Sequence, residues 1–101
     1  MVVETMKQEA QRLLANTPED KVFWLNSGRI IHNMKELAEE LKNMSDETYT
    51  YHVNEQKNDF INWVKDVIQD ESLARDLRRA SNRTQAARAA ANRVNMLSKR
   101  M

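Results

Sequence analysis

Residues 52–68, HVNEQKNDFINWVKDVI, place a polar segment directly before the most apolar helical pattern of the chain. Apolar residues recur there at helical spacing and cover a wide face of one helix: Phe60, Ile61, Trp63, Val64, Val67 and Ile68. In the polar segment, Asn54 or Asn58 can act as the N-cap, because a side-chain oxygen there accepts hydrogen bonds from unpaired helix N–H groups. Glu55 and Asp59 suit the positive end of the helix dipole. The stretch therefore predicts a joint between two helices.

A second interpretation of the same stretch is an active site, in which His52 is a general base and Asp59 orients it. The stretch supplies no Ser or Thr nucleophile and no Gly-rich loop for phosphate. His52, Glu55 and Asp59 could together hold a metal, but their spacing is not diagnostic, and the other histidine, His32, is distant in sequence. We therefore expect no catalytic residue, no metal site, no cofactor and no small-molecule substrate. A small hydrolase built around His52 and Asp59 is the alternative.

The aromatic residues Trp24 and Trp63, together with Phe23 and Phe60, could form a stacking platform for nucleic-acid bases. Each buried aromatic side chain removes about 150–250 Å² from water, whereas a domain of this size has a net stability of only about 5–10 kcal/mol. Exposing all four would leave the fold short of buried surface. We expect these side chains in the core, including Trp63, with room for one of the two tryptophans at the surface.

The segments before this stretch predict a helix and then a hairpin. Apolar residues at helical spacing over residues 2–15 predict an N-terminal helix within residues 1–16. Asn16-Thr17-Pro18 ends it, because the residue before a proline is disfavoured in helical backbone. Strand-forming residues on both sides of Asn26-Ser27-Gly28 predict a β-hairpin near residues 22–31.

Helix-start signals divide the rest of the chain. Asn33 fits an N-cap, with Glu36 completing a capping box, and Ser45, Asp70 and Thr84 fit the starts of later helices. The last of these is a basic C-terminal helix over residues 84–100, whose alanines permit close approach of another helix. The pattern predicts a mainly α fold, a compact bundle of about five to six short helices with a minor β-hairpin.

Composition agrees with a single domain over residues 1–101. The chain is 41% apolar and 31% charged, with one Gly and one Pro, which excludes a disordered chain and a many-stranded β-protein. There is no cysteine, so disulfides and thiolate metal sites are excluded. The run Val22-Phe23-Trp24-Leu25 is far too short for a membrane span, and the N-terminal residues lack the apolar region of a signal peptide. We expect a cytoplasmic protein with no membrane partner.

Charge is distributed unevenly along the chain. Residues 1–70 hold 8 Lys or Arg and 13 Asp or Glu, a net charge of −5, whereas residues 71–101 hold 8 and 2, a net charge of +6. This asymmetry predicts either a polyanionic partner or packing of the basic segment on the acidic part of its own chain, for instance on Glu36, Glu39, Glu40 or Glu47. The candidate partner or nucleic-acid contacts are Arg75, Arg79, Arg83, Arg88, Asn92, Arg93, Lys99 and Arg100.

The run from Met34 to Leu77, MKELAEELKNMSDETYTYHVNEQKNDFINWVKDVIQDESLARDL, resembles a small helical domain of unknown function that recurs in archaeal proteins, alone or appended to larger chains. Its most specific part is HVN-x3-NDF-x-NW-x2-DV, and the family-like region covers residues 21–97. The resemblance implies a compact helical unit of archaeal origin, and it carries over no reaction, cofactor or catalytic residue. This chain departs from the pattern in its tail, which has no acid from Leu77 to Met101.

A domain that is appended to other chains is more typical of a docking module than of an enzyme. We therefore expect a non-catalytic interaction module that binds another protein. The alternative is nucleic-acid or ribonucleoprotein binding through the basic C-terminal helices, over residues 75–100. The uniformly basic tail is the feature that favours this alternative.

Overall fold

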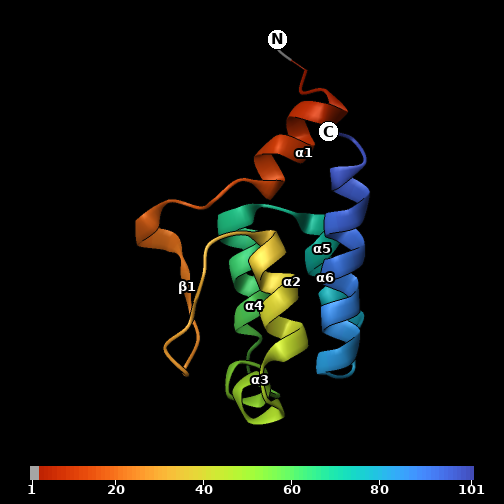
Figure 1. Ribbon diagram of the computed structural model, residues 1–101. Helices are drawn as coiled ribbons and strands as arrows, with labels where there is room; N and C mark the ends of the chain where they lie inside the picture. The colour runs from red at the N-terminus through yellow and green to blue at the C-terminus, as the bar shows by residue number, and fades with distance from the viewer. Residues whose placement is uncertain (1–2) are drawn as a thin grey trace.

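The apolar stretch after residue 58 forms a helix of the core in the computed structural model, which describes residues 3–101 (Figure 1). Helix α4, Asp59–Trp63, continues directly into a π-helix, η2, Val64–Ile68. Phe60, Trp63 and Val64 are all buried. The side chain of Asn58 accepts a hydrogen bond from the Ile61 N–H at 3.0 Å, so Asn58 is the N-cap, whereas Asn54 accepts from Gln56 within the preceding turn. The predicted joint is therefore confirmed as a structural feature.

The remaining elements complete a mainly helical bundle. They are α1 (Met6–Leu14), a 3-10 turn η1 (Glu19–Lys21), β1 (Phe23–Trp24), β2 (Ile30–Ile31), α2 (Met34–Asn43), α3 (Asp46–His52), α5 (Glu71–Arg79) and α6 (Arg83–Ser98). Within residues 3–101 there are six α-helices and a two-stranded antiparallel hairpin, and 65% of these residues are helical. The predicted fold class is confirmed. No helix of these residues is long and apolar enough to cross a membrane.

Two predicted helix boundaries are wrong at their starts. Helix α6 begins at Arg83 and its N-cap is Asn82, which accepts from the Gln85 N–H at 2.9 Å, so Thr84 lies inside the helix. Helix α1 begins at Met6, because Thr5 and Gln8 cap it reciprocally. Residues 3–5, which were predicted to be helical, therefore precede the helix. Residues 1 and 2 of the predicted helix lie outside the residues that the structure describes.

The cap of α2 differs from the predicted one in a single hydrogen bond. Asn33 accepts from the Glu36 N–H at 2.8 Å, as predicted. The Glu36 carboxylate accepts from the backbone N–H of His32 rather than from that of Asn33, and it also contacts the His32 ring. Although burial opposes it, the pKa of Glu36 lies below its usual range, chiefly because of the backbone hydrogen bond from His32. Ser45 and Asp70 cap α3 and α5 as predicted.

The hairpin packs against α4 through the aromatic side chain of Phe23. Phe23 pairs with Ile31 and Trp24 pairs with Ile30, and Gly28 in the turn has a φ of 94°. The Phe23 ring stacks on Phe60 with centroids 4.9 Å apart. Its neighbour Trp24 points outward and is 61% exposed. The sequence leaves room for one tryptophan at the surface, and Trp24 is that residue. A hairpin of this size is marginal alone, so its stability depends on this contact.

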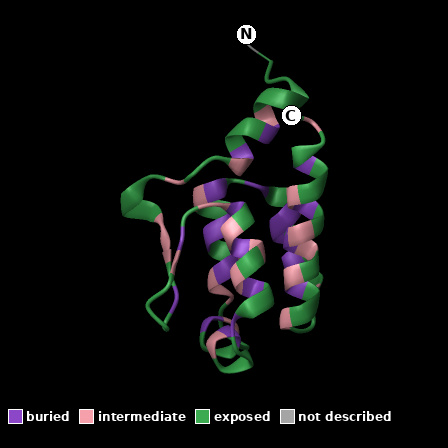
Figure 2. Cartoon of the chain, in the orientation of Figure 1, coloured by how far each residue is buried: buried purple, intermediate pink, exposed green. Residues whose placement is uncertain are grey.

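Helix α6 forms one long side of the bundle. It packs most extensively against α2, and α5 lies beside it. Figure 1 shows α1 across one end of the bundle, close to the C-terminal residues, with α3 at the opposite end. In Figure 2 the buried positions of α2, α4 and α6 face one another, and the outer faces of these helices are exposed. On α6 the buried side chains are Ala86, Ala90, Arg93 and Leu97.

The junction after η2 contains a strained residue. Gln69 has φ 67° and ψ 44°, in the left-handed region, and it is the one non-glycine residue with positive φ between residues 3 and 101. The N–H groups of Gln69 and Asp70 both donate to the carbonyl of Val64, at 2.7 and 3.1 Å. This reversal ends the π-helix and places Asp70 at the start of α5.

We expect Gln69→Gly to raise the free energy of unfolding by about 0.5–1 kcal/mol, because glycine has no Cβ to strain left-handed backbone. Urea denaturation of the two proteins measures the difference. Gln69→Ala is the matched control, since it keeps the Cβ, and it should not stabilise. A destabilised glycine variant would show instead that the Gln69 side chain contributes more than its backbone strain removes.

Candidate functional site

Three of the predicted contact residues bind acidic or carbonyl groups of their own chain. The buried Arg93 donates through Nε to Asp70 Oδ2 at 2.8 Å and through Nη2 to Asp70 Oδ1 at 3.2 Å. Arg100 donates to Glu9 Oε1 at 3.2 Å, which joins the C-terminal end to α1. These contacts place the basic segment on the acidic part of its own chain.

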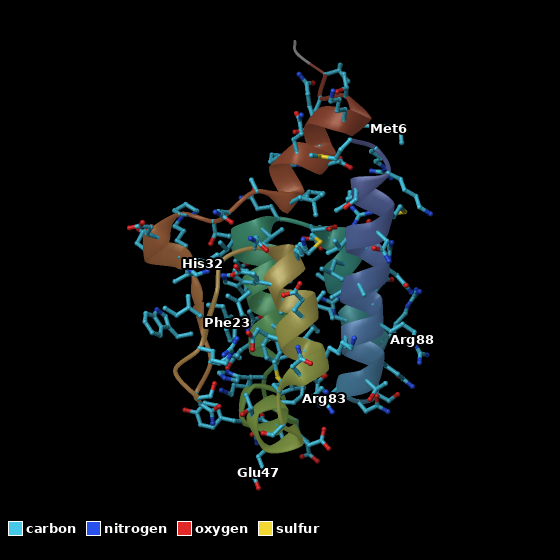
Figure 3. All side chains as sticks on the ribbon, viewed as in Figure 1. Met6, Phe23, His32, Glu47, Arg83 and Arg88 are labelled. Atoms are coloured by element: carbon cyan, nitrogen blue, oxygen red, sulfur yellow. The ribbon has the colours of Figure 1, made fainter. Side chains whose placement is uncertain are left out.

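Arg83 closes the end of α2. Its Nε donates to Asp46 at 2.9 Å, and its Nη1 donates to the carbonyls of Leu41 and Lys42 at 2.9 and 2.8 Å. The last carbonyls of a helix have no partner within the helix, so Arg83 satisfies two of them. In Figure 3, Arg83 lies where α6 approaches α3, whereas Arg88 points away from the bundle.

The acids that bind the basic segment are different from those named as examples in the sequence analysis. Glu40 pairs with Arg29 of the hairpin at 2.8 Å, and Glu36 contacts His32. The cations of α6 and its C-terminal end instead use Asp46, Asp70 and Glu9. Which acid pairs with which cation depends on how the helices pack, and not on how far apart the two residues are in the sequence.

The other predicted contacts remain on the surface. Arg75, Arg79, Arg88 and Lys99 are exposed and have no ion-pair partner within residues 3–101, and Asn92 is exposed as well. Arg78, which is outside the predicted set, shares these properties. The basic segment therefore divides into cations held by the fold and cations available to a partner.

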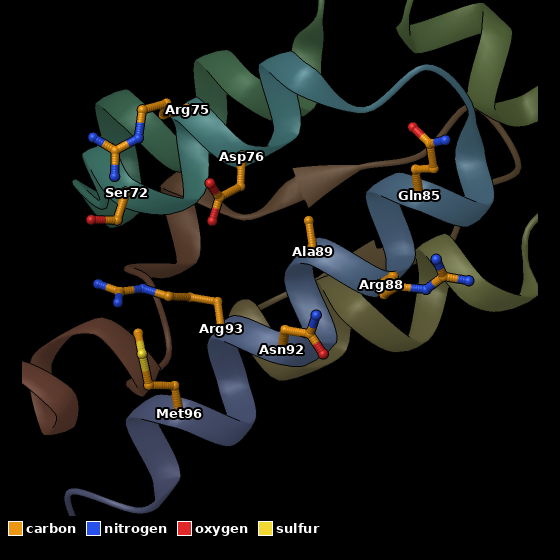
Figure 4. Close-up of a pocket in the computed structure, with 9 residues that line it drawn as sticks. All are labelled: Ser72, Arg75, Asp76, Gln85, Arg88, Ala89, Asn92, Arg93 and Met96. Carbon is orange, nitrogen blue, oxygen red and sulfur yellow. The ribbon is translucent and has the colours of Figure 1, made fainter.

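Four of the eight predicted residues line a groove between α5 and α6, and this groove has a volume of about 480 Å³ (Figure 4). The four are Arg75, Arg88, Asn92 and Arg93, whereas Arg79, Arg83, Lys99 and Arg100 lie outside the lining. We name this feature the α5–α6 groove. Its full lining is Ser72, Arg75, Asp76, Gln85, Arg88, Ala89, Asn92, Arg93 and Met96.

The α5–α6 groove has toward each end an arginine that is unpaired within residues 3–101, and one carboxylate, Asp76, between them. In Figure 4, Arg75 and Arg88 extend toward opposite ends, and Asp76 and Ala89 lie between them. Met96 contributes apolar surface and is 43% exposed. Since the charge of Arg93 is matched by Asp70, the unbalanced charges of the lining are the two end arginines and Asp76. This arrangement suits a partner with apolar groups and separated carboxylates.

Sequence reasoning identified Asn92 but missed five other residues of the groove lining: Ser72, Asp76, Gln85, Ala89 and Met96. Gln85, Ala89, Asn92 and Met96 follow one another at helical spacing and form a second stripe on α6, beside the buried stripe. That spacing was readable from the sequence. The contribution of α5 was not, because it depends on how the two helices pack.

His52, the candidate general base, is buried and both of its ring nitrogens are occupied. Nδ1 lies 3.0 Å from Asp59 Oδ2, and Nε2 accepts from the backbone N–H of Asn26 at 3.1 Å. The second contact requires an unprotonated Nε2, so the proton of the neutral ring is on Nδ1 and is donated to Asp59. His52 thus joins the hairpin to the start of α4. Within residues 3–101 no cluster of three or more metal-ligating side chains is present.

Asp59 is held ionised at this joint. Burial alone would raise its pKa, but the hydrogen bonds from Lys57 and His52, together with the charge of Lys57, bring the pKa below its usual range. A depressed carboxyl pKa contributes stability above the unfolded-state value of about 3.9. That contribution is lost as the pH falls through the folded-state value.

We expect His52→Ala to lower the free energy of unfolding by about 1–3 kcal/mol, because it removes a buried ring that contacts Phe23 and Phe60 and accepts from the Asn26 N–H. Partner binding should be unchanged. His32→Ala is the control, since His32 is exposed and its loss should cost no more than about 0.5 kcal/mol. Thermal melting and a binding assay measure the two effects. Loss of binding with an unchanged melting temperature would identify His52 as a functional residue.

Comparison of the chain with protein-family models, curated proteins and solved structures found no match. The resemblance to an archaeal helical domain therefore stays a prediction from the sequence.

Proposed function

We propose that the protein is a non-catalytic, cytoplasmic docking module that binds another protein through the α5–α6 groove. The observation that supports this best is the groove itself, in which neutral and apolar side chains and one carboxylate, Asp76, lie between two unpaired arginines. Exposed surface of this kind, hollowed between two rigid helices, is a common form of recognition site. The occupied nitrogens of His52 favour a non-catalytic role for the other candidate site.

Several features favour a protein partner over a nucleic acid. Three of the seven predicted cationic contacts, Arg83, Arg93 and Arg100, bind groups of the chain itself. Asp76 stands inside the groove, where it would repel a phosphate backbone. The sequence pI of about 8.1 is also below that of a strongly basic domain.

The alternative function, nucleic-acid or ribonucleoprotein binding, is supported by one observation. Five exposed cations of the C-terminal region have no ion-pair partner within the described chain: Arg75, Arg78, Arg79, Arg88 and Lys99. If all five contacted phosphates of duplex DNA, the log–log dependence of affinity on salt would have a slope of about −4.5. All eight Lys and Arg of residues 71–101 would give about −7.

Affinity capture from a native lysate, with and without nuclease, tests the proposed function. The wild-type chain should retain its protein partners after nuclease treatment. The double variant Arg75→Glu and Arg88→Glu should lose them, because it reverses both end charges of the groove. The matched control, Arg78→Glu and Lys99→Glu, makes the same charge change outside the groove and should retain them.

Two outcomes would contradict this proposal. Release of the captured proteins by nuclease would show that nucleic acid connects them to the chain. Equal retention by the groove variant and its control would place the docking surface elsewhere.

A further inference from the structure

We propose that the segment bound in the α5–α6 groove is an amphipathic helix with an apolar stripe and carboxylates about two turns apart. This inference rests on the proposed function and specifies the partner. Three observations carry it: the shape of the groove walls, the way α6 already packs against an amphipathic helix, and the distribution of charge along the groove.

The walls of the groove are helical stripes. On α6 the lining residues recur at three- and four-residue steps, from Gln85 to Met96, and on α5 they are Ser72, Arg75 and Asp76. A third helix can lie between two such helices, with its side chains between their ridges. The small Ala89 lets the backbone of the partner helix approach closely, and the flexible Met96 can adapt to the side chains of the partner helix. From Gln85 to Met96 the groove is about 16 Å long, which is about three turns of a partner helix.

Helix α2 shows how α6 packs against an amphipathic helix within the same chain, although the ion pairs of Glu36 and Glu40 are made with His32 and Arg29 and not with α6. The sequence of α2, MKELAEELKN, buries Met34, Leu37 and Leu41 and carries three glutamates. It packs against α6, whose buried side chains include Ala86 and Ala90. An arginine of α6, Arg83, contacts the final carbonyls of α2. Ala89 and Arg88 provide the same combination of a small residue and an arginine on the exposed face of α6.

Charge then restricts where the carboxylates of the partner lie. Arg75 and Arg88 point toward opposite ends of the groove, and neither has an ion-pair partner within residues 3–101. Asp76 occupies the middle, where a second carboxylate would be repelled. A partner helix should therefore carry one acid near each end and neutral or basic residues between them.

Fluorescence anisotropy with designed peptides tests this inference. The probe is a fluorescein-labelled helical peptide of about 16 residues, matching the length of α6, with a leucine and alanine stripe and two glutamates two turns apart. We expect a dissociation constant of about 10–100 μM at physiological salt. Replacing both glutamates by glutamine should weaken binding about tenfold, and scrambling the stripe at constant charge should weaken it at least as much.

Exchanging the charges of the groove and the peptide distinguishes a loss of direct recognition from a loss of folding. Arg75→Glu with Arg88→Glu should weaken binding of the glutamate peptide about tenfold, and a peptide with lysines at those two positions should regain it. The control Arg78→Glu with Lys99→Glu should change binding less than about twofold. Rescue by the lysine peptide would support direct pairing, since an unfolded variant could not be rescued.

Three results would overturn the inference. If the scrambled peptide bound as tightly as the original peptide, charge alone would explain recognition. If the glutamine peptide bound as tightly, apolar contact alone would explain it. Absence of binding to the designed peptide would exclude an acidic helix as the occupant. If the lysate experiment still gave groove-dependent, nuclease-resistant capture, the proposed function would stand and the inference alone would fail.

Discussion

Replacing Arg93 with alanine should lower the free energy of unfolding by about 3–5 kcal/mol, a large part of the stability expected for a domain of this size. Arg93 and Asp70 form a bidentate ion pair whose side chains are only 9% and 2% exposed. Removing the guanidinium leaves the Asp70 carboxylate buried without its charge partner. Urea denaturation at neutral pH measures the loss.

Two further variants show whether the loss comes from the pair. Asp70 also caps α5 by accepting from the Leu73 N–H, and asparagine can keep that hydrogen bond. Asp70→Asn with Arg93→Met should therefore recover most of the stability, because no buried charge remains. Arg88→Ala, on an exposed position of the same helix, should cost less than about 0.5 kcal/mol. A loss below about 1 kcal/mol for Arg93→Ala would show that the pair is solvated.

Trp63→Ala should cost a similar amount, about 3–5 kcal/mol. The indole is buried in α4 and its ring lies edge-on to Phe23 at 5.9 Å. Its Nε1 donates to the carbonyl of Lys21 at 2.8 Å, so the variant would lose this hydrogen bond in addition to the packing. Trp63 thus joins α4 to the segment before the hairpin, and thermal and chemical denaturation should both detect its loss.

Trp24→Ala is the matched control for this prediction. Trp24 is 61% exposed, and its removal should cost less than about 1 kcal/mol. Similar losses for the two tryptophans would contradict the burial described for Trp63. A loss below about 1 kcal/mol for Trp63→Ala would place its ring at the surface and favour a base-stacking role.

The sequence predicts the features of the fold that depend on local chemistry. Asn58, Ser45 and Asp70 are N-caps in the structure because each bonds to a backbone N–H three residues ahead, within its own segment. The start of α6 was harder, since Asn82 and Thr84 are both good caps two residues apart. The π-helix and the left-handed Gln69 have no local signal of comparable strength.

Pairs between distant segments were not predictable in the same way. Asp70 and Arg93 are 23 positions apart, and Arg83 and Asp46 are 37 apart. The charge asymmetry indicated that the basic segment could pack on the acidic one, but the choice of partners depends on how α2, α5 and α6 pack. The α5–α6 groove has the same origin. Its arginines were identifiable by charge, whereas Asp76 and Ala89 become site residues only when the two helices lie side by side.

Nucleic-acid affinity at increasing salt tests most directly whether the basic residues of α5 and α6 serve protein docking. We would titrate the wild-type chain with fluorescein-labelled duplex DNA and single-stranded RNA, from about 50 to 200 mM salt. Docking predicts weak, sequence-independent binding, with a dissociation constant of about 10⁻⁴ M or higher at physiological salt. A sub-micromolar complex would contradict docking and establish nucleic-acid binding if its salt slope were near −4.5 on duplex DNA, or near −3.5 on single-stranded RNA. Each of Arg75, Arg78, Arg79, Arg88 or Lys99 removed should then reduce the slope by about one.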